Sequence, residues 1–309
     1  MTHLGNRRPA WHGLVALASA ICMALGLAAC GPSGDNEQSK AATGRGPITV
    51  VASINQWGSL ARRIGGKDVH VTSIVHSVSV DAHDFEPRTS DIAAIQKAAI
   101  VVTNGAGYDS WATKSIVRSS IRVDAADAVG AGEGDNAHLW FSKDARRAMA
   151  TELADAFAKA RPGKAKAFQS RLKAWRADEG RLDRRMADFS KRHRHASYGA
   201  TEAVAYYLMA DMGLDDRTPE GYARAVNSEG EPAPGDLRDF QNLIAKRGID
   251  LLIDNVQESN GTTTLLVDSA KQGKVPVVDV TEQMPEGQRD LTVWVGSLAD
   301  AVSRAAGKA

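Results

Sequence analysis

Short apolar runs alternate with segments of helical period from Pro47 to the end of the chain. The apolar runs predict β-strands at residues 48–53, 69–75, 99–103, 121–123, 196–200, 249–253 and 275–280. Between them, apolar residues recur three and four positions apart, which predicts helices at residues 56–64, 90–97, 108–117, 142–160, 203–212, 237–246, 263–271 and 291–305. Strands that alternate with helices in this way are typical of α/β folds with parallel sheets.

One helical segment, residues 164–195, is much longer than the others. Its apolar stripe recurs at helical spacing and consists of Phe168, Leu172, Trp175, Leu182, Met186 and Phe189. At about 1.5 Å per residue, such a helix measures on the order of 45 Å, which is enough to lie along two lobes. We therefore predict an N-terminal lobe at 47–162, a linker helix at 163–195 and a C-terminal lobe at 196–309, with a long loop in the Pro- and Gly-rich stretch 215–235.

The N-terminal segment has the pattern of an export signal. Two arginines precede an unbroken apolar run at residues 14–27, and the run ends in the sequence LAAC at 27–30. The run is shorter than the roughly 20 apolar residues that a membrane-spanning helix needs. LAAC resembles the bacterial lipobox, in which the chain is cut before the Cys and the Cys is acylated. We expect a signal peptide at 1–29 and a lipid on Cys30, with Sec export favoured over the twin-arginine route.

Residues 30–46 then join the anchor to the fold. The stretch is rich in Gly and Ser and has almost no apolar residues, so it predicts a flexible tether. The protein is expected on the outer face of the cell membrane, held there by its lipid.

Charge and cysteine content limit which ligands the chain can bind. The formal net charge is +1, from 38 Lys and Arg against 37 Asp and Glu, so no basic field exists to hold nucleic acid. The two cysteines are Cys22 and Cys30. Cys22 is lost with the signal and Cys30 is used for the lipid, so the mature chain has no thiol for a metal. Any metal must be held by His and carboxylate side chains. We expect a monomer.

Polar side chains follow several of the predicted strands, where open parallel sheets place their ligands. Four of them combine this position with a metal-binding group: His83, His138, Glu202 and Glu282. Imidazole and carboxylate together suit Zn, Mn and Fe. Each residue taken alone is more often a solvated surface group. Taken together, they predict a divalent-metal site in the cleft between the lobes.

Three segments of the chain resemble a known family. They are ITVVASINQWGSLARRIGG at 48–66, DAHDFEP at 81–87 with TSDIAAIQKAAIVVTNG after it, and NAHLWFS at 136–142. They are similar to the metal-binding lipoproteins of bacterial ABC importers, the zinc and manganese solute-binding proteins. In that family the first ligand lies in a D-P-H-x-[YF]-E-P segment and the second in an H-[VL]-W segment. The resemblance runs from about Pro47 to the C-terminus.

The resemblance implies a ligand set in this order along the chain: His83, His138, Glu202 and Glu282. Glu202 stands where zinc-type members have a His and manganese-type members have a Glu. Glu282 matches an acidic ligand that follows a late strand. Ala82 departs from the family, which usually has Pro at that place.

The resemblance also implies a function. The chain would capture a divalent metal outside the membrane and deliver it to a membrane permease, which works with an ATPase subunit. The metal would be the transported substrate, with no catalytic cofactor. Two carboxylates in the ligand set, and an acidic loop at 124–136 without His, favour manganese or iron, while zinc stays open. A long bridging helix predicts that release needs only a modest lobe shift.

Two alternatives come from other classes of protein. A secreted metallohydrolase needs an open coordination position on its metal, which four protein ligands would fill. The sequence also has no H-E-x-x-H or G-x-S-x-G motif. A surface adhesin is compatible with the lipid anchor but is supported by no motif of its own. We therefore predict that the chain is not an enzyme.

Overall fold

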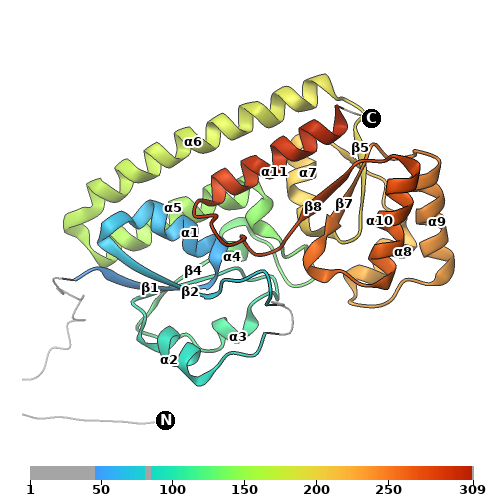
Figure 1. Cartoon of the computed structure of the whole chain (residues 1–309). Coiled ribbons are helices and arrows are strands. Elements are labelled where there is room, and N and C mark those ends of the chain that lie inside the picture. Colours follow the sequence, from blue (N-terminus) through green and yellow to red (C-terminus); the bar gives the residue numbers. More distant parts are fainter. Residues whose placement is uncertain (1–45, 81–84, 308–309) are drawn as a thin grey trace, which may run out of the picture. The chain divides into compact units, whose positions relative to one another are not determined.

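The computed structural model describes residues 46–80 and 85–307. Two four-stranded parallel sheets organise these residues (Figure 1). The strands of the first sheet lie in the order β2-β1-β3-β4 and those of the second in the order β6-β5-β7-β8. Their bounds are β1 Ile48–Ile54, β2 Val69–Val75, β3 Ile100–Thr103, β4 Ile121–Asp124, β5 Ser197–Ala200, β6 Asp215–Asp216, β7 Leu251–Asn255 and β8 Val277–Val280. The two sheets thus share one topology. We call the elements around the first sheet the N-lobe and those around the second the C-lobe.

Helices cover both sheets. Their bounds are α1 Asn55–Gly65, α2 Thr89–Lys97, α3 Ser110–Thr113, α4 Ala125–Val129, α5 Lys143–Ala160, α6 Ala165–Arg192, α7 Tyr206–Met212, α8 Glu220–Asn227, α9 Pro234–Ala245, α10 Gly261–Gly273 and α11 Leu291–Ala306. Inner strands such as β3 and β7 are buried along their whole length, as expected where helices pack on both faces of a parallel sheet. This architecture confirms the predicted α/β fold with two parallel sheets and one long helix.

The long helix α6 connects the two lobes along one side of the structure (Figure 1). It has 28 residues and packs against α1 and α5 of the N-lobe and against α7 and α11. The six apolar residues of its predicted stripe are all buried, and its other faces carry charged side chains. One apolar core runs from the N-lobe along this helix into the C-lobe.

Two local predictions were wrong. The stretch 215–235 is not a continuous loop, because it contains β6 and the eight-residue helix α8. Tyr222 holds this helix in place, since its ring is buried and lies 5.0 Å from that of Phe240. The helix predicted at 108–117 is reduced to the four residues of α3, because only a short turn forms between the loop at Gly107 and the polar residues that precede β4.

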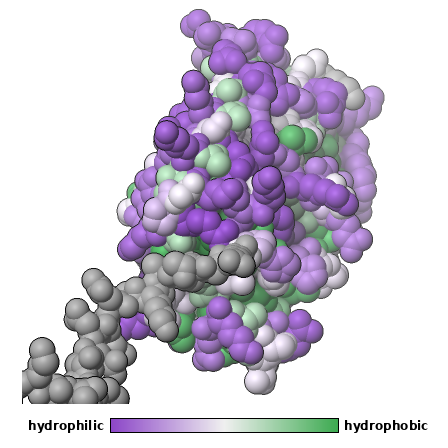
Figure 2. All heavy atoms as spheres, turned by 90° about the vertical axis from the view of Figure 1, so that its left-hand side faces the viewer, coloured by the Kyte–Doolittle hydropathy of each residue, from purple (hydrophilic) through white to green (hydrophobic). Residues whose placement is uncertain are grey.

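Hydrophilic side chains predominate among the described residues on the face shown in Figure 2. The large apolar residues with high exposure come from separate elements: Val129, Tyr206, Val256, Leu265 and Val293. Among residues 46–80 and 85–307, no helix has the length and apolar character to cross a bilayer. The predicted signal peptide, Cys30 and residues 31–45 of the predicted tether lie outside the described residues.

Candidate metal site

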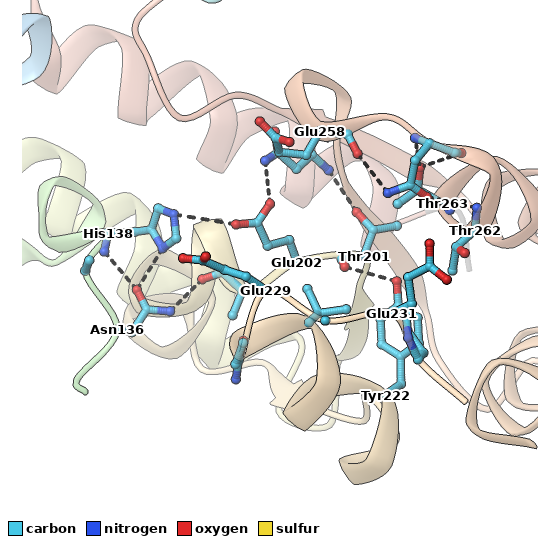
Figure 3. Close-up of a pocket in the computed structure, with 18 of the residues that line it drawn as sticks. Asn136, His138, Thr201, Glu202, Tyr222, Glu229, Glu231, Glu258, Thr262 and Thr263 are labelled. Carbon is cyan, nitrogen blue, oxygen red and sulfur yellow. Dashed lines mark hydrogen bonds and ion pairs between the residues drawn. The ribbon is translucent and has the colours of Figure 1, made fainter. Parts of the chain in front are cut away.

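A pocket of about 1050 Å³ opens beside the carboxyl ends of the C-lobe strands. His138 and Glu202 lie at one end of it, and Tyr222, Thr262 and Thr263 at the other (Figure 3). Its wall also carries four further carboxylates, from Asp135, Glu229, Glu231 and Glu258. Because like charges gather here, the entrance favours cations over anions.

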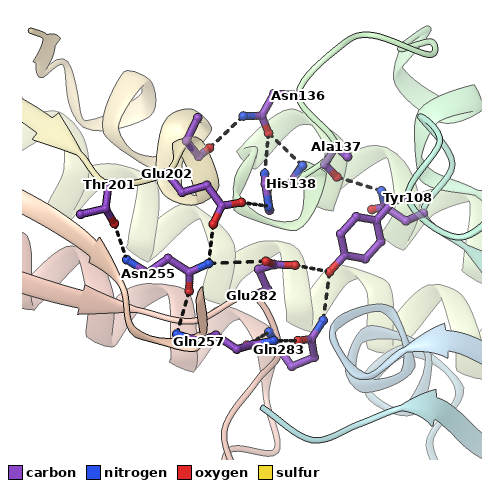
Figure 4. Close-up of polar contacts among 12 residues, drawn as sticks. Tyr108, Asn136, Ala137, His138, Thr201, Glu202, Asn255, Gln257, Glu282 and Gln283 are labelled. Atoms are coloured by element: carbon purple, nitrogen blue, oxygen red, sulfur yellow. Dashed lines mark hydrogen bonds and ion pairs between the residues drawn. The ribbon is translucent and has the colours of Figure 1, made fainter. Parts of the chain in front are cut away.

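Three side chains with metal-binding atoms converge where His138 and Glu202 line this pocket (Figure 4). They are His138, Glu202 and Glu282, and one ligand atom from each lies within 4.8 Å of the others. His138 Nε2 is 4.0 Å from Glu202 Oε1. His138 and Glu282 are buried, whereas Glu202 is partly exposed to the pocket. The structure thus brings together three of the four predicted ligands, while His83 lies outside the described residues.

Each of the three comes from the end of a strand or from a loop between elements. A single residue, Thr201, separates Glu202 from the end of β5. A single residue, Thr281, likewise separates Glu282 from the end of β8. His138 precedes the 3₁₀ turn Leu139–Phe141, which leads into α5. Two of the candidate ligands therefore lie at the carboxyl edge of one parallel sheet, and the third faces them from the N-lobe.

Asn136 orients the His138 ring. Its carboxamide nitrogen donates to the carbonyl of Ala203 at 2.8 Å, so its oxygen must face His138. That oxygen accepts from the His138 backbone N–H at 2.9 Å and lies 3.0 Å from Nδ1. Since an amide oxygen only accepts hydrogen bonds, Nδ1 carries a proton. In the neutral imidazole, Nε2 then presents its lone pair toward Glu202. This tautomer is the one that can bind a metal through Nε2.

Tyr108 of the N-lobe orients Glu282. Its hydroxyl donates to Glu282 Oε2 at 2.6 Å and accepts from Gln283 Nε2 at 2.9 Å. Burial, together with the adjacent Glu282 charge and hydrogen bond, raises the pKa of Tyr108 well above its ordinary value. The phenol therefore stays protonated and acts as a donor to the carboxylate.

Asn255, at the end of β7, sets the spacing of the two carboxylates. Its Nδ2 donates to Glu202 Oε2 at 2.6 Å and lies 3.5 Å from Glu282 Oε1. Its own Oδ1 accepts from the backbone N–H of Gln257 at 3.1 Å, which fixes the amide orientation. One neutral amide thus holds two negative side chains close together, and a divalent cation between them would relieve their repulsion.

Glu282 belongs to the C-lobe by sequence, but the N-lobe helix α1 holds the segment that carries it. Gln56 Nε2 donates to the Glu282 carbonyl at 2.5 Å, and Asn55 exchanges two hydrogen bonds with the backbone of Met284, at 2.9 and 3.1 Å. Further along, the Ser59 hydroxyl accepts from the Leu291 N–H at 3.0 Å. We call residues 282–291 the crossing segment.

Sequence reasoning did not single out the residues that orient the ligands, Tyr108, Asn136 and Asn255. For Asn255 a signal existed, because it lies two residues after the predicted strand 249–253, at the edge where ligands gather. Asn136 lies two residues before His138, which is close enough for an Asx-type contact with the backbone. No local signal identifies Tyr108, because it meets Glu282 only in the folded chain.

Comparison with known proteins agrees with this geometry. Residues 50–305 match the ZnuA family, described as zinc-uptake complex component A, periplasmic. The chain belongs to this family. The match spans both lobes and the linker helix, so it covers every described residue of the candidate site. The ZnuA family supplies the solute-binding components of uptake systems, which confirms the predicted family and the prediction that the chain is not an enzyme.

Individual relatives are more distant. Zinc-binding protein AdcA of Streptococcus pyogenes serotype M6 is 23% identical over 294 residues, covering 83% of this chain. The chain spans only 56% of the length of AdcA. Manganese-binding lipoprotein MntA of Bacillus subtilis is 24% identical over 240 residues, which cover 73% of this chain and 76% of MntA. Among solved structures, FpvC of Pseudomonas aeruginosa, determined with Mn²⁺, superposes with a TM-score of 0.68 at 19% identity, covering 85% of this chain and 99% of FpvC.

The family match establishes the general role of the chain. It is an exported solute-binding component of a metal-uptake system. Because the sequence identity to FpvC is low, the structural likeness shows the fold alone.

Proposed function

We propose that the chain captures a divalent transition metal through His138, Glu202 and Glu282, with His83 as the fourth ligand. The convergence of three ligand atoms within 4.8 Å carries this proposal. One imidazole and two carboxylates offer the nitrogen and oxygen donors that Mn²⁺, Fe²⁺ and Zn²⁺ accept. The assignment of His83 rests on its place in the DAHDFEP segment.

The cargo is Mn²⁺ or Zn²⁺, with Fe²⁺ as a third candidate. Zn²⁺ binds most nitrogen and oxygen sites more tightly than Mn²⁺, so selectivity must come from geometry and ligand type. Two carboxylates make this set harder than one rich in imidazole, which favours Mn²⁺. The relatives AdcA and MntA are named for zinc and manganese respectively, so both metals occur among similar proteins.

Delivery requires partners in the membrane. We propose that the chain passes its metal to an ABC permease, which an ATPase subunit drives, and that a lipid on Cys30 keeps the chain at the outer face of the membrane. The lipobox-like LAAC sequence supports the anchor, and the description of the family as a component of an uptake complex supports the partners.

Calorimetric titration of the purified, chelator-stripped protein with Mn²⁺ and with Zn²⁺ tests the proposal. We expect one metal per chain and a raised melting temperature, because a ligand that binds only the folded state stabilises it. His138→Ala should abolish tight binding, and so should His83→Ala.

His70→Ala is the matched control, because His70 is exposed on β2 away from the site. It should bind metal like the unaltered protein. Absence of binding in the unaltered protein, or undiminished binding in both His138→Ala and His83→Ala, would refute the proposed site.

A further inference from the structure

A fully buried ion pair joins α5 to the linker helix α6. Arg146 of α5 and Glu179 of α6 are 0% and 1% exposed. Arg146 Nε donates to Glu179 Oε1 at 2.8 Å, and Nη2 lies 2.5 Å from the same oxygen. A buried pair of this kind contributes little net stability, because desolvation offsets the attraction between the charges. Its presence in the core therefore calls for another explanation.

Arg146 holds the segment that follows His138. Its Nη1 donates to the carbonyls of Trp140 and Phe141, at 3.1 and 2.8 Å. These two residues belong to the 3₁₀ turn Leu139–Phe141, which begins directly after His138. The guanidinium thus fixes the backbone on the C-terminal side of this ligand, while Asn136 fixes it on the other side.

Glu179 holds the other ligand-bearing segment as well. Its second oxygen, Oε2, accepts from the Thr292 hydroxyl at 2.9 Å, and that hydroxyl accepts from Trp175 Nε1 at 3.0 Å. Thr292 lies in the first turn of α11, directly after the crossing segment that begins at Glu282. One oxygen of Glu179 is therefore connected through Arg146 to the turn that follows His138. The other is connected through Thr292 to the end of the crossing segment that begins at Glu282.

From these contacts we infer that Arg146, Glu179 and Thr292 are positioning residues, which set the separation of His138 and Glu282 and thereby the affinity of the metal site. The inference rests on the proposed function. Polar groups that orient ligands from outside the coordination shell typically change metal affinity by about 10- to 100-fold. The helix α6 acts as a rigid spacer, since its buried stripe anchors it to both lobes.

The double variant Arg146→Met/Glu179→Leu removes the pair without leaving a lone buried charge. We expect it to fold, with a melting temperature near that of the unaltered protein when metal-free, but to bind Mn²⁺ about tenfold more weakly. Arg185→Met/Asp300→Leu is the matched control, because this exposed pair also joins α6 to another helix, α11. The control should bind Mn²⁺ like the unaltered protein.

Thr292 gives a second test that does not disturb a charge. Thr292→Val keeps the shape of the side chain but loses the hydroxyl, and should weaken Mn²⁺ binding several-fold. Thr292→Ser keeps the hydroxyl and should restore it. A purely structural role would lower the melting temperature of the metal-free protein and leave the affinity of the folded fraction unchanged.

Full Mn²⁺ affinity in both the double variant and Thr292→Val would overturn the inference, provided that the unaltered protein binds and His138→Ala does not. Failure of the unaltered protein to bind would instead refute the proposed function. If the double variant does not fold, the comparison of Mn²⁺ affinity between Thr292→Val and Thr292→Ser alone tests the inference.

Discussion

The Tyr108 hydroxyl donates to Glu282 across 2.6 Å, and so a residue of the N-lobe orients a carboxylate that follows the last strand of the C-lobe. The bond fixes one oxygen of Glu282 and leaves the carboxylate facing Glu202 and His138 (Figure 4). A metal at this point would bind a carboxylate that is already held in place.

Removing the Tyr108 hydroxyl tests whether the orientation of Glu282 raises the affinity for metal. Tyr108→Phe should lower the affinity for Mn²⁺ or Zn²⁺ by about 10- to 100-fold, because the carboxylate loses its donor. Calorimetric titration measures the change. Tyr206→Phe, at an exposed tyrosine, serves as the control and should bind normally. Equal affinities for Tyr108→Phe and the unaltered protein would show that Glu282 needs no such support.

Asn136 provides a test of the histidine tautomer. Asn136→Ala removes the acceptor for His138 Nδ1 and the bond to Ala203, so the ring can rotate or change tautomer. We expect metal affinity to fall by about 10- to 100-fold. Asn227→Ala, at an exposed position in the same pocket, should leave binding unchanged. A normal titration for Asn136→Ala would mean that the ring is held by other contacts.

A stability prediction concerns Gly199, in the middle of β5. A Cβ at this position would come within 2.6 Å of Phe240 Cε2. Gly199→Ala should therefore reduce the free energy of unfolding by about 1–3 kcal/mol, as measured by urea titration. Gly132→Ala, where nothing lies within 4 Å of the added carbon, should change it by less than about 0.5 kcal/mol. Comparable losses in both variants would contradict the packing argument.

A pH dependence follows from Asp68, which accepts a hydrogen bond from Arg171 of α6 at 2.9 Å. Burial acts to raise the pKa of Asp68, but the bond from Arg171 and the charge of Lys164 outweigh it, so the pKa is lowered. The unfolded chain then binds a proton more readily than the folded one. The stability that Asp68 contributes is present above its ordinary pKa and is lost as pH falls through the lowered one.

Asp68→Asn should accordingly cost about 1.5–3 kcal/mol near pH 7, the usual worth of a hydrogen bond to a charged group. The difference from the unaltered protein should shrink below about pH 4. Urea unfolding across this pH range measures it. Asp188→Asn, which alters an exposed pair, should show little effect at any pH. A difference for Asp68→Asn that is constant with pH would disprove the assignment of the pKa shift.

The fold was predictable because its signals are local. The buried strands appear as apolar runs, and the stripe on α6 repeats at a helical period, so both could be identified without knowledge of the tertiary contacts. The helix α8 was missed because Pro and Gly flank it and a single buried aromatic, Tyr222, is enough to stabilise it. Short elements of this kind depend on tertiary packing more than on pattern.

The structure brings three of the predicted ligands together, but the contacts that orient them were not predicted. His138, Glu202 and Glu282 combine metal-binding side chains with positions at strand ends or in a family motif. The contacts that orient them join residues far apart in the sequence, as Tyr108 and Glu282 illustrate. No spacing along the chain encodes such a pair, so only the folded structure reveals it.

The crossing segment has a consequence for how the chain is made. Asn55 and Ser59 form hydrogen bonds with residues that are synthesised more than two hundred positions later. Domains usually fold in the order in which they are translated. Here the contacts of Asn55 and Ser59 form only after the crossing segment has been synthesised, so the packing of the N-lobe is completed by one of the last parts of the chain to be translated.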